Sequence, residues 1–70
     1  MSEAWIPVDS SAIRAVMHDG AGMHVEYVSG KTYLHPGVSE TRFHEFLKAD
    51  SKGRYFNAHI ARQHPGKLKR

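Results

Sequence analysis

Residues 13–35 read IRAVMHDGAGMHVEYVSGKTYLH, and their pattern decides the fold class. Hydrophobic and polar residues alternate in three short runs, separated by glycine-containing turns at 19–22 and 29–30. Such alternation is typical of half-buried strands joined by tight turns. The stretch therefore predicts a three-stranded antiparallel meander with its last strand over 31–35. With Leu34 opposite, its inner face is expected to carry Ile13, Met17, Val25 and Tyr27.

The residues on either side of the meander predict a fourth strand and two helices. Residues 5–8 include a proline, which confines any strand there to a sheet edge. Ser39 can cap a first helix, and Ser51 can cap a second helix that runs to about His64. The apolar residues at helical spacing are Phe43, Phe46 and Leu47 in the first helix and Phe56 and Ile60 in the second.

These elements predict an α+β fold, in which a three- to four-stranded antiparallel meander precedes two α-helices packed on one of its faces. The chain has 70 residues, enough for a single domain. We expect that domain to span residues 4–64, with flexible termini at 1–3 and 65–70, since Pro65 stops the second helix. A core this small supplies only about 3–5 kcal/mol, so a deep substrate cavity and catalysis are not expected.

The composition excludes several classes of site. Cysteine is absent, which excludes disulfides, cysteine-based zinc sites and thiol catalysis and fits a reducing cytoplasm. The first residues do not resemble a secretory signal, and the apolar runs are too short to span a membrane. Six histidines are present, but none forms a metal-binding motif. We expect surface histidines, no bound metal and no cofactor.

Charge is distributed unevenly along the chain. Residues 31–70 hold nine of the ten lysines and arginines but only three of the seven aspartates and glutamates. A basic half suits a polyanion such as RNA or single-stranded DNA. The alternative is a solvated surface that keeps a small protein soluble.

The stretch from Ala49 to Arg62 reads Ala-x-Ser-x-Gly-x-x-Phe-Asn-x-x-Ile-x-Arg. With the Tyr-Leu-His run at 33–35, it resembles the KTSC domain, and the resemblance covers about residues 5–64. That family is named for the C-terminus of some lysyl-tRNA synthetases and includes free-standing bacterial and phage proteins. The resemblance implies RNA binding by association with the synthetase. At residues 33–35 the family motif is Tyr-x-Tyr, so His35 stands in place of the second tyrosine. Tyrosine is also frequent in the family at the position of His18.

Three groups of residues are candidates for binding an anion or a nucleic acid. At the start of the second helix, free amides and two cationic side chains suit a phosphate, unless the glycine there packs against the sheet. One stripe of that helix combines an aromatic ring, an imidazole and a guanidinium, which can stack bases and pair with phosphates, or form an amphipathic rim. The third group shares one face of the third strand, which is either open to RNA or covered by the helices. In this order the groups are Ser51, Lys52, Gly53 and Arg54; Tyr55, His59 and Arg62; and Lys31, Tyr33 and His35.

These observations predict a small non-catalytic module that binds RNA or single-stranded DNA through its basic C-terminal helix. The alternative is a protein-interaction adaptor or regulatory protein of bacterial or phage origin, with a protein partner. No membrane partner is expected. The chain is expected to be a monomer or a weak homodimer formed through an open sheet edge.

Overall fold

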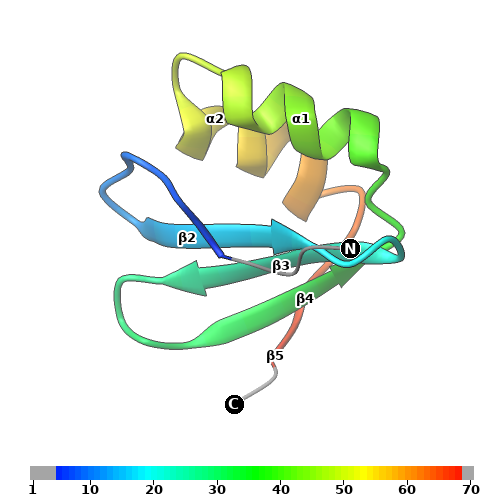
Figure 1. Ribbon diagram of the computed structural model, residues 1–70, viewed down its shortest axis with the longest axis horizontal. Helices are drawn as coiled ribbons and strands as arrows, with labels where there is room; N and C mark the ends of the chain where they lie inside the picture. The colour runs from blue at the N-terminus through cyan, green and yellow to red at the C-terminus, as the bar shows by residue number, and fades with distance from the viewer. Residues whose placement is uncertain (1–4, 69–70) are drawn as a thin grey trace.

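The computed structural model describes residues 5–68 and contains a five-stranded sheet with a helical layer over one face (Figure 1). The antiparallel strands lie in the order β1 to β5 and span Ile6–Pro7, Ile13–His18, Gly22–Tyr27, Thr32–Pro36 and Lys67–Leu68. The helices α1 and α2 and the π-helix η1 span Glu40–Lys48, Lys52–Phe56 and Asn57–Ala61. The predicted α+β fold is confirmed. No helix in the described part is long and apolar enough to cross a membrane.

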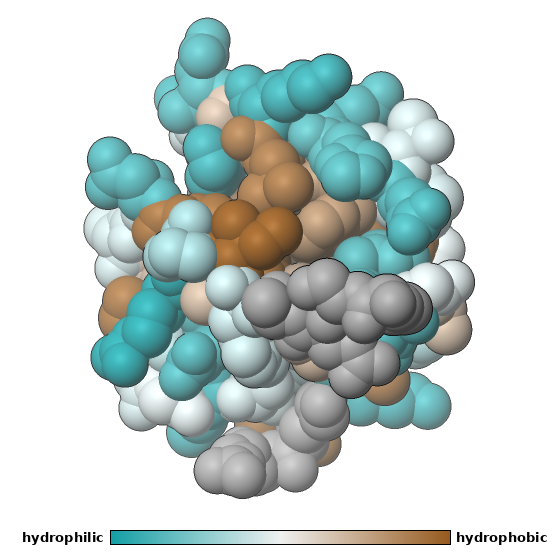
Figure 2. Space-filling model, in the orientation of Figure 1, coloured by the Kyte–Doolittle hydropathy of each residue, from teal (hydrophilic) through white to brown (hydrophobic). Residues whose placement is uncertain are grey.

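The core lies between the sheet and the helical layer. Figure 2 shows hydrophobic side chains in the band between the two layers and hydrophilic ones over the helices. The most completely buried apolar residues are Ile13, Val16, Met23, Val25, Val38, Phe43, Phe46, Phe56 and Ile60. The predicted apolar stripes of both helices therefore face the core, with Leu47 only partly buried at its margin.

Helix α1 begins where its sequence predicts. The hydroxyl of Ser39 accepts a hydrogen bond from the backbone N–H of Arg42 at 3.1 Å. Glu40 lies in the first turn and Lys48 in the last, so both charges interact favourably with the helix macrodipole. This cap starts the helix directly after the loop that leaves β4.

A bulge in β2 changes which side chains face the helices. Ile13 pairs with Tyr27 and Ala15 with Glu26, so Arg14 is an extra residue that shifts the alternation by one position. Beyond the bulge Val16 is fully buried, whereas Met17 lies on the opposite face. The expectation that Met17 joins the core is therefore wrong.

The second helix changes type halfway along its length. Residues 52–56 form α2, and residues 57–61 continue it as the π-helix η1, where a single α-helix to about His64 was expected. Phe56 and Ile60 are buried as predicted. Isolated π turns of this kind occur frequently at functional sites.

The chain after Pro65 forms a strand that the sequence analysis did not expect. Residues 67–68 pair with Tyr33 and Leu34 as β5. A hydrogen bond holds the residues just before this strand against β4, since His35 Nδ1 donates to the carbonyl of His64 at 2.8 Å. Gly66 packs on the same imidazole so closely that a Cβ there would lie 2.5 Å from its Cε1 atom. Of the termini expected to be flexible, 1–3 and 65–70, residues 1–3 and 69–70 lie outside the described residues.

Candidate nucleic-acid interface

The first predicted group lies at the start of α2, where its polar groups are partly engaged. Ser51 occupies the N-cap position, but its hydroxyl makes no capping hydrogen bond. Lys52 Nζ donates to the carbonyl of Ala49 at 3.2 Å, so its ammonium group caps the C-terminal end of α1. Within residues 5–68, a Cβ added to Gly53 would have no atom within 4 Å, so this glycine does not pack against the sheet.

Two carboxylates also surround the start of α2. A pocket of about 300 Å³ is lined by Asp9 and Asp50 together with Ser51, Lys52 and Gly53. A phosphate group there would approach two negative charges. Arg54 is different, because it is exposed and its guanidinium group makes no hydrogen bond or ion pair within residues 5–68. Of this group, Arg54 is the side chain best placed to meet an anion.

The second predicted group contains a pair of rings in contact. The Tyr55 and His59 rings have centroids 4.6 Å apart and planes inclined by 37°. The Tyr55 hydroxyl donates to Glu45 Oε1 at 2.7 Å and accepts from Arg42 Nη1 at 3.5 Å. These bonds hold the tyrosine ring against α1. Burial and the bond to Glu45 raise the pKa of Tyr55.

Arg62, the third member of this group, follows the π-helix. The predicted stripe assumes a turn of 100° per residue, and the i to i+5 bonding of a π-helix widens the turn and reduces that angle. Arg62 is exposed, and among the described residues its guanidinium group has neither a hydrogen bond nor an ion pair. The segment therefore presents a tilted ring pair and two guanidinium groups without a partner among residues 5–68, one before the pair in the chain and one after it.

The third predicted group lies mainly on the face that the helices cover. Tyr33 pairs with Val25 and His35 with Met23, and both partners belong to the core. His35 is only 3% exposed, and its ring packs at right angles to Phe56 with centroids 5.0 Å apart. Burial lowers the pKa of His35 despite its bond to the His64 carbonyl. This face was expected to be either open to RNA or covered by the helices, and the structure shows that the helices cover it. His35 is therefore out of reach of a ligand.

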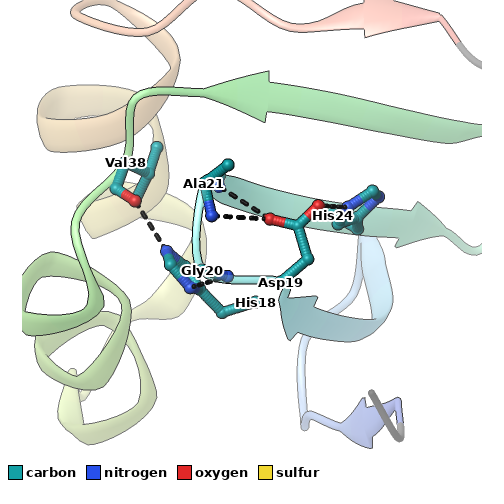
Figure 3. A network of polar contacts seen from close by, with 7 residues as sticks. His18, Asp19, Gly20, Ala21, His24 and Val38 are labelled. Carbon is teal, nitrogen blue, oxygen red and sulfur yellow. Dashed lines mark hydrogen bonds and ion pairs between the residues drawn. The ribbon is translucent and has the colours of Figure 1, made fainter. Parts of the chain in front are cut away.

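A polar network at the β2–β3 turn was missed by the sequence analysis (Figure 3). Asp19 Oδ1 accepts from the amides of Ala21 and Gly22, both at 2.9 Å, and Asp19 Oδ2 pairs with His24 Nε2 at 2.8 Å. His18 Nδ1 accepts from the amide of Gly20 at 3.0 Å. Its Nε2 therefore donates to the Val38 carbonyl at 2.6 Å, which ties this turn to the loop before α1.

The sequence contained part of the signal for this network. An aspartate that opens a glycine-rich turn commonly accepts from amides two and three residues ahead. The prediction of surface histidines is wrong for His24 and His35, which are 6% and 3% exposed. In residues 5–68, no group of three or more metal-binding side chains is placed to hold an ion.

We expect Asp19 to make the fold sensitive to acid. Its bond to His24 and the amides of Ala21 and Gly22 hold the pKa of Asp19 far below its usual range. A carboxyl group whose pKa is lowered by folding stabilises the fold in its ionised form, above about pH 4. That contribution is lost as the pH falls toward the folded-state pKa. The thermal midpoint of the wild type should therefore fall more between about pH 5 and pH 2 than that of Asp19→Asn.

The asparagine variant is a matched control because its amide oxygen can still accept from the two backbone amides. Melting curves followed by circular dichroism at several pH values measure the difference. An equal fall of the thermal midpoint in both proteins would show that ionised Asp19 makes no specific contribution to the acid sensitivity of the fold.

Comparisons with known proteins agree with the resemblance noted in the sequence. Residues 9–64 match the family model described as the KTSC domain. The fold is similar to the crystal structure of a KTSC domain protein from Yersinia pestis, with 28% sequence identity and a TM-score of 0.85. The alignment covers 93% of this chain and 94% of that one. The comparison with curated proteins gave no match.

Proposed function

The chain belongs to the KTSC domain family, and from that premise we propose that it binds RNA or other single-stranded nucleic acid through the exposed surface of α2 and η1. The observation that carries the proposal is the charge of this part of the chain. Residues 51–70 contain six lysines and arginines and no aspartate or glutamate. Within this stretch the exposed residues Arg54 and Arg62 come before and after Tyr55 and His59 in the chain, and the rings of the latter two are in contact.

The arrangement suits a flexible, single-stranded polyanion. Free guanidinium groups bind phosphates by charge-assisted hydrogen bonds, and an aromatic platform between them can stack a base without reading its identity. The bonds from Tyr55 to Glu45 and Arg42 restrain the ring before a ligand arrives, which reduces the entropy lost on binding. The proposed activity is binding without catalysis, and a cytoplasmic location would give the domain access to RNA.

The start of α2 contributes less to this proposal than the sequence suggested. Lys52 is bonded to the Ala49 carbonyl, and the nearby pocket contains Asp9 and Asp50. The proposed phosphate contacts are therefore made by Arg54 and Arg62, with the remaining cations acting through their long-range field.

A fluorescence-anisotropy titration tests the proposal with a labelled single-stranded oligoribonucleotide of about eight nucleotides, a length within the range of known single-strand sites. Affinity should fall with added salt. The slope of log K against log salt should be about −1.4, since each phosphate contact to a single strand contributes about −0.7. An absence of binding at about 50 mM salt, where phosphate contacts are strong, would contradict the proposal. Salt-insensitive capture of a protein from nuclease-treated lysate would instead favour the adaptor alternative.

A further inference from the structure

The loop before β2 and the β3–β4 turn lie at one end of the molecule, on the left of Figure 1. Residues of both segments line a second concave site. It is a pocket of about 480 Å³. Its walls include Tyr27 and Tyr33, and its rim includes Ser11, Ser29 and Lys31. The proposed function does not use this pocket, although Lys31 and Tyr33 were singled out from the sequence.

The two tyrosines form a fixed aromatic corner. Their ring centroids are 5.4 Å apart, and the planes are nearly perpendicular at 89°. Tyr27 also packs edge-on against the buried ring of Phe56, with centroids 6.4 Å apart. Both side chains are half-buried, and neither hydroxyl makes a hydrogen bond within residues 5–68. The corner therefore offers two aromatic rings and two hydroxyl groups that make no hydrogen bond among the described residues.

The charge around this pocket is positive. Lys31 is exposed at its rim, and among the described residues no carboxylate lines it. The guanidinium group of Arg14 lies alongside, since Nη2 donates to the carbonyl of Val28, another lining residue, at 3.2 Å. The neighbouring pocket at the start of α2 is lined by Asp9 and Asp50 instead. Of the two, only the tyrosine pocket combines aromatic walls with cations and no acid.

We propose that the tyrosine pocket is a nucleotide subsite, in which the base packs against Tyr27 and Tyr33 while the attached phosphate meets Lys31. A planar ring matches the perpendicular tyrosine pair. Serine and tyrosine hydroxyls can each donate to or accept from the polar edge of a base. The identification of the ligand as a nucleotide rests on the proposed function, whereas the shape and charge of the pocket do not.

The test is a titration of the ¹⁵N-labelled protein with adenosine 5′-monophosphate, followed by amide NMR. The amides of Ala12, Val28 and Ser29 should shift, with a dissociation constant on the order of 1 mM for a ligand this small. Tyr33→Leu should weaken binding at least about fivefold, at the lower end of one base–aromatic stack, and Tyr33→Phe should retain it. The spectrum of each variant also reports whether it folds.

A second part of the test uses a variant of an exposed residue, so it does not require the substitution of a half-buried tyrosine. Lys31→Ala should weaken binding of the monophosphate but not of adenosine, which lacks the phosphate. Lys48→Ala removes an exposed cation from α1 and should leave both affinities unchanged.

The inference is overturned if about 10 mM monophosphate, roughly ten times the expected dissociation constant, shifts none of these amides or shifts only those of α2 and η1. Equal effects of Lys31→Ala on the two ligands would also overturn it. Oligoribonucleotide binding that persists in either case leaves the proposed function standing and removes the pocket alone. Occupation of the pocket by the monophosphate, with no oligoribonucleotide binding, contradicts the proposed function and supports the subsite.

Discussion

Gly22→Ala is expected to remove most of the protein's net stability. A Cβ at this position in β3 would lie 2.7 Å from the His35 carbonyl oxygen and 2.9 Å from the Pro36 Cα. Both atoms belong to the backbone of β4, so no side-chain rotation can relieve the overlap. Forcing the two strands apart costs about 3 kcal/mol, which is comparable to the entire net stability of a domain of this size.

Gly53→Ala is the matched control and should change stability in the opposite direction. The added methyl group would meet no atom of the described residues within 4 Å, and alanine favours a helix by about 1 kcal/mol over glycine. Urea denaturation followed by circular dichroism measures both variants. A Gly22→Ala protein with wild-type stability would show that β3 and β4 do not approach as closely as described.

Removing both exposed arginines of the α2–η1 surface should weaken oligoribonucleotide binding strongly. If Arg54 and Arg62 each contact one phosphate, the double alanine variant should bind at least about tenfold more weakly at about 50 mM salt. Its salt slope should also be smaller in magnitude by about 1.4 than that of the wild type. The same anisotropy titration supplies both numbers.

Lys48→Ala controls for the loss of net charge in this experiment. It also removes one exposed cation but lies on α1, outside the proposed contact surface. Lys48→Ala should reduce affinity by less than about twofold relative to the wild type, which is a smaller loss than that of either single arginine variant. Its salt slope should change little. Equal losses in Lys48→Ala and Arg62→Ala would mean that binding follows total charge and that the α2–η1 surface has no special role.

The local elements of the fold could be predicted because each depends on residues close together in the chain. Alternation around two glycine-containing turns predicted β2, β3 and β4. The start of α1 followed from Ser39 and its hydrogen bond to a residue three positions away. The contact of Tyr55 with His59 likewise followed from a spacing of one helical turn. In all these cases the deciding interaction spans only a few residues.

The candidate interface was predictable in its chemistry but not in its geometry. The charge asymmetry and the KTSC resemblance identified Arg54, Arg62 and the aromatic residues from the sequence. That Lys52 is engaged by the Ala49 carbonyl depends on how α1 ends beside α2. That Tyr33 meets Tyr27 in a pocket depends on strand pairing.

By itself, the sequence determined the strands of the meander, the start of α1, the buried positions Phe56 and Ile60, and the basic character of the C-terminal half. Only the tertiary structure decided that Val16 replaces Met17 in the core, that His35 is buried and that residues 67–68 join the sheet. Each of these outcomes depends on contacts between segments far apart in the chain. A bulge, a covered face or an added strand is selected by the packing of the whole domain, which no local pattern specifies.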